Sequence, residues 1–263
     1  MGSIDFDESI RAPGPLRLAL EWRAPWEYGA SIASLPLLRS APRGDGHPVL
    51  VFPGLAASDF STLPLRRFLR ERGYAPHRWR QGMNLGPRPG VISSSLHRIH
   101  DLRHRYGKKV SLIGWSLGGV YARELAKLAP DDVRFVITLG APFTGNPKAT
   151  NAWRLYELAS GHRIDDARLR TGLHEAPPVP TTSIYSRSDG VVAWQCSVQK
   201  EGPLAENIEV QASHVGMGMN PMVFFAIADR LAQPEGEWKP FDRGGLRRFV
   251  YRDPRRSSLF GIF

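Results

Sequence analysis

The sequence predicts an α/β fold: a mostly parallel central sheet with helices on both faces and a small helical cap. Two patterns predict this class. Short apolar runs of strand length alternate with helix-length amphipathic segments, which is typical of parallel strands joined by crossover helices. A glycine-flanked serine also lies between one such run and the helix expected after it. At 263 residues the chain has the size of one large α/β domain, so we expect a single domain over residues 1–263.

The expected strands are short runs rich in Val, Ile and Leu that end in glycine, proline or polar residues. They lie at residues 47–54, 75–79, 109–115, 133–139, 182–186 and 207–211. The expected helices have one apolar face, and they lie at residues 58–73, 91–106 and 117–129. In the first of them, Leu63, Leu65, Phe68 and Leu69 can share the buried face. A further helix begins after Asn220, an N-cap residue that is followed by proline.

Three segments do not follow this alternation. Residues 15–40 are rich in leucine and tryptophan and are interrupted by Pro25 and Pro36, which predicts broken helices packed on the sheet; insertion into a membrane surface is the alternative. Residues 143–179 are too long for a simple crossover, and their helical spacing of apolar residues predicts a cap over a pocket. Residues 241–263 form a basic tail with interspersed aromatic residues. We expect this tail to fold along the domain, with binding to anionic lipid or RNA as the alternative.

Composition excludes several classes of protein. Hydrophobic residues make up 42% of the chain and charged residues 23%, with a mean hydropathy of −0.29, which excludes wholesale disorder. No apolar run reaches the roughly 18–20 residues of a membrane-spanning helix. The first residues lack a basic stretch followed by an apolar one, so we expect no secretory signal and a cytoplasmic location, with or without membrane association. The single cysteine, Cys196, allows neither an internal disulfide nor a multi-cysteine zinc site.

The chain is basic, with a formal net charge of +10 that is concentrated in two regions. Residues 60–110 contain twelve Lys and Arg against two Asp and Glu, and residues 241–263 contain six against two. Such charge can attract nucleic acid or an anionic membrane. We interpret it as the solvated surface of basic helices and expect no nucleic acid partner, while peripheral contact with an anionic membrane stays open. The sequence does not indicate an oligomeric state.

The strongest motif is Gly-x-Ser-x-Gly at residues 114–118, with Ser116 at its centre. It follows an apolar strand and precedes a helical segment, which is the context that the motif requires. The flanking glycines are needed because the turn brings the backbone too close for a β-carbon, so that the serine hydroxyl projects beyond the sheet. Ser116 is therefore the expected nucleophile.

A serine hydroxyl is a poor nucleophile by itself and needs a base, which in turn needs a partner that fixes its tautomer. Among the eight histidines, only His214 follows the last expected strand, where a loop can return it to the serine. Asp189 lies in a turn after the preceding strand and is the expected acid. Glu201 and Glu206 are the alternative acids.

Attack on a carbonyl creates an oxyanion, which aligned N–H donors must stabilise. One donor is expected to be the backbone N–H of Leu117, which follows the nucleophile at a helix N-terminus. The other is expected from the turn after the first strand, where we select the N–H of Leu55, just after Pro53 and Gly54.

On these residues the chain resembles the α/β-hydrolase superfamily, and within it the bacterial lipase and esterase branch, from about residue 47 to residue 231. The nucleophilic serine of that family, which lies in a sharp turn called the nucleophile elbow, corresponds to Ser116. Its acid and histidine correspond to Asp189 and His214, and its oxyanion amides to Leu55 and Leu117. The Gly-Ala-Pro segment after the strand at 133–139 also resembles many bacterial lipases. The chain departs from the family in lacking an obvious opening β-hairpin, and in having proline where a histidine often precedes the oxyanion-loop glycine.

The resemblance implies a serine hydrolase that cleaves carboxylic esters through an acyl-enzyme, without a metal or organic cofactor. The apolar residues of the expected cap predict an apolar acyl group, as in a lipid, a lysophospholipid or a small hydrophobic ester. The expected pocket residues are Trp115, Phe143, Trp153, Tyr156, Val191 and Met217. Two alternatives stay open: an acyltransferase with the same triad, and a basic protein that binds membranes or nucleic acid on a hydrolase scaffold.

A second histidine pattern has a simpler interpretation. His100 and His104 lie one turn apart on an expected helix and could bind a metal from one face, but the zinc motif's glutamate does not follow His100. We interpret these residues as part of a solvated, arginine-rich helix.

Overall fold

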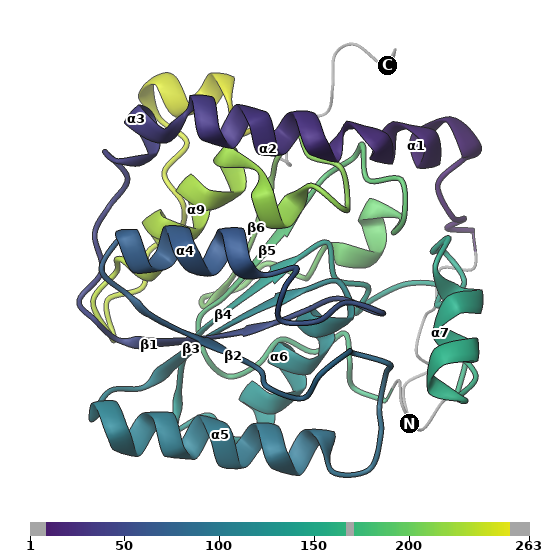
Figure 1. Cartoon of the computed structure of the whole chain (residues 1–263), viewed down its shortest axis with the longest axis horizontal. Helices are drawn as coiled ribbons and strands as arrows, with labels where there is room; N and C mark the ends of the chain where they lie inside the picture. The colour runs from purple at the N-terminus through teal and green to yellow at the C-terminus, as the bar shows by residue number, and fades with distance from the viewer. Residues whose placement is uncertain (1–8, 167–170, 253–263) are drawn as a thin grey trace.

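The computed structural model describes residues 9–166 and 171–252. Its centre is a parallel sheet in the order β2-β1-β3-β4-β5-β6 (Figure 1). The strands are β1 (Pro48–Phe52), β2 (Ala75–Arg78), β3 (Val110–Trp115), β4 (Val133–Leu139), β5 (Thr181–Tyr185) and β6 (Ala205–Glu209). Helices α5 (Val91–Tyr106) and α6 (Leu117–Leu128) cover one face, and α4 (Leu63–Glu71) and α9 (Pro221–Leu231) cover the other (Figure 1). The expected sheet with helices on both faces is confirmed.

The central strands are apolar on both sides because helices cover both faces of the sheet. Every residue of β4 is buried, and β3 is buried up to Gly114. Parallel register aligns Phe52 at the end of β1 with Gly114, and Trp115 with Leu139 at the end of β4. The loops that follow these strands therefore meet at one edge of the sheet, where the expected nucleophile lies.

The first amphipathic helix differs from its expected pattern. Leu63 is exposed, and Arg66 lies on the buried side of α4 instead. The guanidinium of Arg66 donates to the backbone oxygen of Asp59 at 2.7 Å and to Thr62 Oγ1 at 3.0 Å. These bonds satisfy the buried charge locally, so an arginine replaces an apolar residue on the inner face.

The last strand begins two residues before its expected start. Glu206 is buried within β6, where its carboxylate accepts from Thr182 Oγ1, from the backbone N–H of Phe241 and from Arg230. Asn207 is also buried and exchanges hydrogen bonds with the backbone of Gln199. Polar residues can lie in a buried strand when other groups of the protein satisfy their hydrogen bonds. A search for runs of apolar residues therefore misses the start of this strand.

The N-terminal segment consists of broken helices, as expected. They are α1 (Pro15–Ala19), the 3-10 helix η1 (Leu20–Arg23), α2 (Ala24–Ala33) and α3 (Leu35–Leu38). The expected packing on the sheet is wrong. Helices α2 and α3 contact α9, which separates them from the sheet (Figure 1). Most leucines of the segment and both of its tryptophans are exposed, while Glu21, Ala24, Ser31 and Leu38 face inward.

The remaining elements surround this frame. Helix α7 (Trp153–Ser160), from the expected cap, lies beyond the carboxyl ends of the strands (Figure 1). Besides η1, the described residues form the 3-10 helices η2 (Trp194–Ser197), η3 (Met217–Met219) and η4 (Gly245–Phe249). Up to residue 252 the tail folds along the domain: Phe241 and Tyr251 are buried, and the Tyr251 hydroxyl donates to the Met222 oxygen at 2.8 Å. Residues 253–263 of the expected tail lie outside the described residues.

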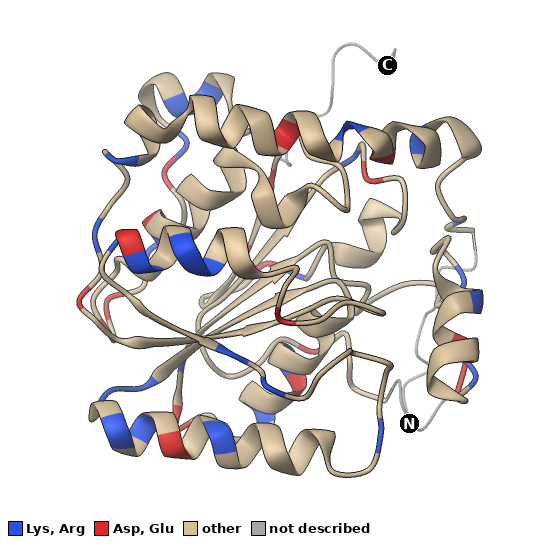
Figure 2. Cartoon of the chain, viewed as in Figure 1, with Lys and Arg blue, Asp and Glu red and all other residues tan. Residues whose placement is uncertain are grey.

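Apart from the buried Arg66, the arginines of the basic helices α4 and α5 are partly or fully exposed, as interpreted from the sequence. Figure 2 shows more basic than acidic residues on α4 and α5, and the basic residues that it colours on both helices are arginines. His97 and His100 are exposed and lie beside Asp101 and Asp132, at 3.6 and 3.4 Å. Within the described ranges, no group of three or more metal-ligating side chains is present, and no helix is long and apolar enough to span a bilayer.

Candidate active site

Ser116 lies in a sharp turn between β3 and α6. Its backbone has φ 53° and ψ −123°, a conformation that costs energy for any residue with a β-carbon. The turn is held by the Ser116 N–H, which donates to the Leu139 oxygen at 2.8 Å, and by the Gly119 N–H, which donates to the Ser116 oxygen at 2.8 Å. Ser116 is partly exposed and directly follows the last residue of β3, at the edge of the sheet.

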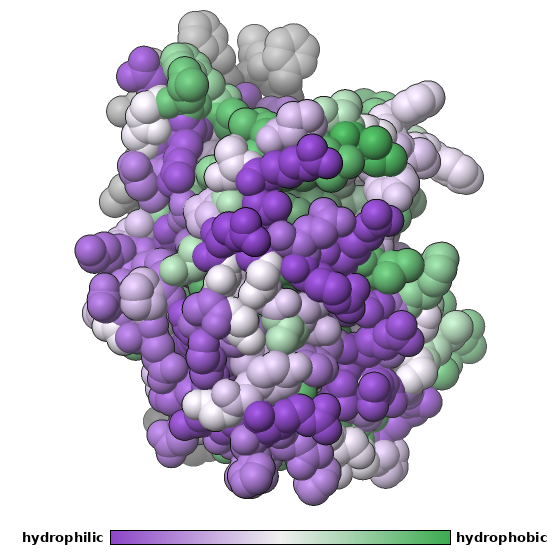
Figure 3. All heavy atoms as spheres, turned by 60° about the vertical axis from the view of Figure 1, so that its left-hand side comes forward, coloured by the Kyte–Doolittle hydropathy of each residue, from purple (hydrophilic) through white to green (hydrophobic). Residues whose placement is uncertain are grey.

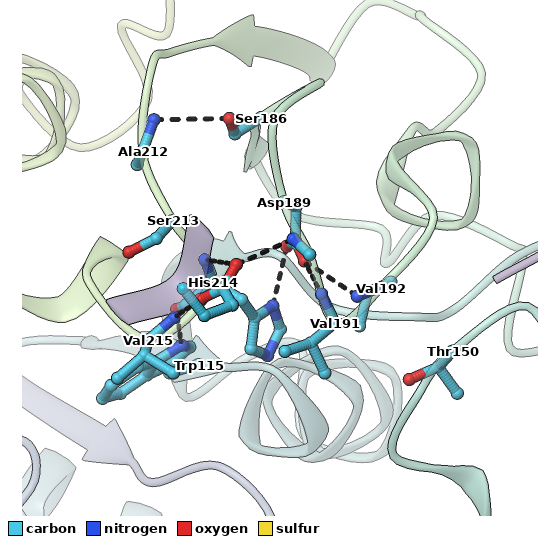
Figure 4. A network of polar contacts seen from close by, with 12 residues as sticks. Trp115, Thr150, Ser186, Asp189, Val191, Val192, Ala212, Ser213, His214 and Val215 are labelled. Carbon is cyan, nitrogen blue, oxygen red and sulfur yellow. Dashed lines mark hydrogen bonds and ion pairs between the residues drawn. The ribbon is translucent and has the colours of Figure 1, made fainter. Parts of the chain in front are cut away.

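His214 and Asp189 form a buried pair beside this turn. The distance from His214 Nδ1 to Asp189 Oδ2 is 2.7 Å (Figure 4). The second carboxylate oxygen, Oδ1, accepts the backbone N–H groups of Val191 and Val192, both at 2.8 Å. Because the carboxylate only accepts, Nδ1 carries the proton and Nε2 is left as the basic nitrogen.

Two opposing effects set the basicity of this imidazole. Burial lowers the pKa of His214, but the charge and hydrogen bond of Asp189, with the charge of Glu21, outweigh burial and raise the pKa above its usual value. Activity that needs the neutral imidazole is therefore lost as the pH falls through this raised pKa.

The carboxyl ends of β3 and β4 adjoin the pair. The indole Nε1 of Trp115 donates to the His214 oxygen at 3.0 Å, which ties the residue before Ser116 to the loop that carries His214 (Figure 4). A β-carbon on Gly140, after β4, would lie 3.1 Å from Asp189 Oδ2, from His214 Nδ1 and from Met217 Sδ. Among the hydrogen bonds of the described residues, none joins Ser116 Oγ to the imidazole. Such bonds often form only when substrate is bound.

The expected oxyanion donors lie in two turns that touch each other. A β-carbon on Gly54 would lie 3.4 Å from Ser116 Cβ, and one on Gly118 would lie 2.5 Å from the Phe52 oxygen. The buried Asn84 holds the first turn, since its Nδ2 donates to the Pro53 oxygen at 2.8 Å. Leu55 and Leu117 follow Gly54 and Ser116 in these turns. Their role as N–H donors to an oxyanion stays a prediction.

The expected pocket residues differ in their surroundings. Trp115, Val191 and Met217 lie at the pair: the Trp115 ring packs on Gly218, and Met217 is buried. Phe143 is also buried, with the Arg123 guanidinium 3.9 Å above its ring.

Trp153 and Tyr156 belong to α7 and are partly exposed. Lys148 and Arg154 lie 6.0 and 5.0 Å from the Trp153 ring centroid. The Tyr156 ring would lie 3.5 Å from a β-carbon on Gly86. These contacts place α7 against the loop before α5, and the contact of either ring with a substrate stays a prediction.

The alternative acids do not lie at the histidine. Glu206 is bonded to Arg230, to Thr182 and to the backbone of Phe241, while Glu201 is exposed. Asp189 is the carboxylate that pairs with His214.

Sequence reasoning missed Glu21 and Glu27, which lie in the N-terminal helices. Glu21 accepts the backbone N–H of Gly190, in the loop after β5 that carries Asp189 (the acid loop), and that of His214, in the loop after β6 (the histidine loop). Glu27 accepts the Ser213 N–H at 2.6 Å. One feature of the sequence could have drawn attention to them: Glu21 and Glu27 are the two acidic residues in a segment, residues 15–40, that is otherwise rich in leucine and tryptophan.

Residues 49–255 match a family model described as the alpha/beta hydrolase family. A comparison with curated proteins finds no match. Among solved structures, lipase B of Aspergillus fumigatus is similar with a TM-score of 0.57 and 18% identity, covering 75% of this chain and 56% of that one. This chain therefore spans little more than half the length of that lipase.

Two further structures resemble the chain. A monoacylglycerol lipase of Paleococcus ferrophilus has a TM-score of 0.54 and 15% identity, over 73% of this chain and 96% of that one. The pyrethroid hydrolase PytH has a TM-score of 0.51 and 21% identity, over 70% and 96%. At these identities the structural likeness concerns the fold. Since the family model covers most of the chain and the sheet is that of the α/β-hydrolase fold, the chain belongs to the alpha/beta hydrolase family.

Proposed function

We propose that this protein is a carboxylic ester hydrolase in which Ser116 is the nucleophile, His214 the base and Asp189 its partner. The observation that supports this most is the buried hydrogen bond of 2.7 Å between His214 Nδ1 and Asp189 Oδ2, next to a serine in a strained strand-to-helix turn. This arrangement leaves Nε2 of His214 available to accept the serine proton, and the raised pKa of the imidazole favours that transfer.

In the proposed reaction, the Ser116 oxygen adds to the ester carbonyl carbon and its proton passes to His214 Nε2. The N–H groups of Leu55 and Leu117 donate to the oxyanion of the tetrahedral intermediate. The C–O bond to the alcohol then breaks, and the alcohol leaves with the proton from the imidazolium. Water adds to the acyl-enzyme by the same route, which releases the carboxylic acid and restores Ser116.

We infer that the acyl group is apolar. Trp115 and Met217 line the surroundings of the histidine, and α7 adds the partly exposed Trp153 and Tyr156 beyond the strand ends. Methionine and aromatic side chains accommodate irregular apolar ligands well. The names of the similar structures, two lipases and a pyrethroid hydrolase, are in keeping with this class of substrate.

Hydrolysis of p-nitrophenyl esters from acetate to palmitate tests the proposal, with Ser116→Ala measured beside the wild type. We expect turnover over one range of acyl lengths, and a loss of about a million-fold in kcat for the variant, as when the nucleophile of a triad is removed. A fluorophosphonate should label Ser116, which mass spectrometry of the peptide detects. Folded wild-type protein that neither hydrolyses any ester nor reacts with the probe would contradict the proposal.

A further inference from the structure

The N-terminal helices contact both loops that carry the proposed base and acid. Glu21, in η1, has only 9% of its surface exposed. Its Oε1 accepts the backbone N–H of Gly190 at 2.7 Å and that of His214 at 2.9 Å, and its Oε2 accepts the N–H of Val215 at 2.8 Å. One carboxylate thus bonds to the backbone beside Asp189 and to the backbone of His214 itself. These short lengths are typical of hydrogen bonds to a charged acceptor.

Further contacts from α1, η1 and α2 hold the N-terminal helices on the same two loops. Arg23 donates to the Ser188 oxygen at 3.2 Å and to Ser188 Oγ at 2.8 Å. Glu27 accepts the Ser213 N–H, and it also forms an ion pair with Arg23 at 3.2 Å. A β-carbon on Gly190 would lie 2.2 Å from the Arg17 oxygen, so the acid loop and α1 touch without space between them.

Glu21 differs from Glu27 in how its charge is compensated. In the part of the chain that the structure describes, no cationic side chain forms an ion pair with Glu21, and its partners are neutral backbone amides. The charges that act on the imidazole are those of Asp189 and Glu21, while the paired Arg23 and Glu27 bond to Ser188 and to the Ser213 backbone. A purely structural link could use a neutral acceptor, whereas an uncompensated buried carboxylate also stabilises a nearby positive charge.

We propose that Glu21 is a positioning residue for the triad, which fixes the acid loop against the histidine loop and stabilises the protonated imidazole of His214. The proposal rests on the proposed function for its kinetic consequence, but its electrostatic part concerns His214 in the free protein. Removing the charge of Glu21 should lower the pKa of His214, because that charge favours the imidazolium.

The test compares Glu21→Gln with Glu27→Gln, the neighbouring carboxylate that already has a cationic partner. For Glu21→Gln we expect kcat/KM to fall by about ten- to a hundredfold, the size expected for hydrogen bonds to a charged group. The acidic limb of its pH profile should move to lower pH. For Glu27→Gln this limb should stay in place. Glu21→Asp, which keeps the charge, should keep the limb near its wild-type position.

NMR titration of the His214 imidazole gives a readout that does not depend on turnover. A lower His214 pKa in Glu21→Gln than in wild type supports the proposal even if no ester is hydrolysed, in which case only the proposed function fails. If Glu21→Gln does not fold, Glu21→Asp tests the positioning role: the His214 pKa should stay near its wild-type value while kcat falls, because the shorter side chain cannot hold both loops. An unchanged kcat in Glu21→Asp would then overturn the proposal. An unchanged His214 pKa together with unchanged kcat/KM in Glu21→Gln would overturn the proposal.

The outward face of the same helices carries a second inference, from different residues. Large apolar side chains cover it, and Trp22 and Trp26 are 85% and 79% exposed. The other exposed members of this outer face are Leu16, Leu18, Leu20, Tyr28, Ile32, Leu35 and Leu37. Hydrophobic spheres lie near the top in Figure 3, where Figure 1 has these helices and η4, and a further group lies at mid-height on the right, while most of the lower surface is hydrophilic. A water-exposed apolar surface of this kind marks an interaction site.

Charge indicates what this outer face contacts. Within residues 9–43 the two carboxylates, Glu21 and Glu27, are turned inward, while Arg17 and Arg39 are exposed. The outer face therefore combines apolar and cationic side chains. Two copies of a chain with a net charge of +10 repel each other, whereas an anionic bilayer attracts each copy.

We infer that the outer face of residues 15–38 binds the surface of an anionic membrane. Trp22 and Trp26 then lie at the level of the lipid headgroups, where an indole ring has both an apolar and a hydrated side. This inference does not depend on which reaction the protein catalyses.

Sedimentation with vesicles tests it, using phosphatidylcholine alone and phosphatidylcholine mixed with phosphatidylglycerol. We expect binding to the mixed vesicles that weakens with salt and falls by about tenfold or more in Trp22→Ala/Trp26→Ala, since affinity scales with buried apolar area. The control is Phe60→Ala, which removes an exposed apolar side chain from outside these helices. Failure to bind the mixed vesicles would overturn the inference, as would a dimer in analytical ultracentrifugation that the double variant abolishes.

Discussion

Asp189→Asn is expected to lower kcat for ester hydrolysis by about ten-thousandfold, the effect of this change in other triads, while the protein stays folded. Asp189 uses both carboxylate oxygens: Oδ2 pairs with His214 Nδ1 at 2.7 Å, and Oδ1 accepts the N–H groups of Val191 and Val192. An asparagine has one oxygen. If that oxygen keeps the two backbone bonds, its NH₂ group faces Nδ1, and the imidazole must place its proton on Nε2. Nε2, the nitrogen proposed to take the Ser116 proton, then cannot accept it.

The exposed Asp242 provides the control, because Asp242→Asn makes the same chemical change outside this pair and should leave kcat within about twofold of wild type. Single-turnover kinetics and circular dichroism of both variants separate the loss of catalysis from a loss of folding. Retention of more than a tenth of wild-type activity by Asp189→Asn would show that another group orients His214.

The sequence allowed the elbow, the acid and the histidine to be selected because each is marked locally. Ser116 lies between an apolar strand and a helix, and Asp189 and His214 each follow a strand. Their separation in the chain did not matter, since a parallel sheet collects the loops after its strands at one edge.

The contacts of the N-terminal helices could not be selected in the same way. Glu21 lies 169 residues from Gly190 and 193 residues from His214, and nothing in the local pattern relates them. Sequence reasoning also expected this segment to pack on the sheet, with insertion into a membrane surface as the alternative. Hydrophobicity identifies which side chains leave water, but it does not say whether the surface that receives them belongs to the same chain.

The polar residues inside the sheet were hidden for a related reason. Glu206 is buried in β6 because Arg230 and two further donors surround its carboxylate, and Arg66 is buried in α4 because the backbone of Asp59 accepts from it. Each position depends on partners that the fold brings together, so a pattern of apolar residues misplaces the ends and faces of such elements.

Gly114→Ala is expected to destabilise the folded protein by about 4 kcal/mol or more, the range in which a single substitution prevents folding of a marginally stable domain. A β-carbon on Gly114 would lie 2.1 Å from the Gly118 oxygen, 2.3 Å from the Gly118 carbonyl carbon and 2.4 Å from Gly119 Cα. All three atoms are backbone atoms at the start of α6, so no side-chain rotation relieves the overlap. Helix α6 would have to move away from β3, and Ser116 would move with it.

Gly29→Ala is the matched control, since a β-carbon on Gly29 meets no atom within 4 Å and the residue lies inside α2. Alanine there should stabilise the protein by about 0.5–1 kcal/mol, because a helix favours alanine over glycine. Urea unfolding followed by circular dichroism measures both changes. A Gly114→Ala protein as stable as wild type would mean that the turn around Ser116 can relax without moving α6, and the close approach of β3 to α6 would then not explain the glycine in this motif.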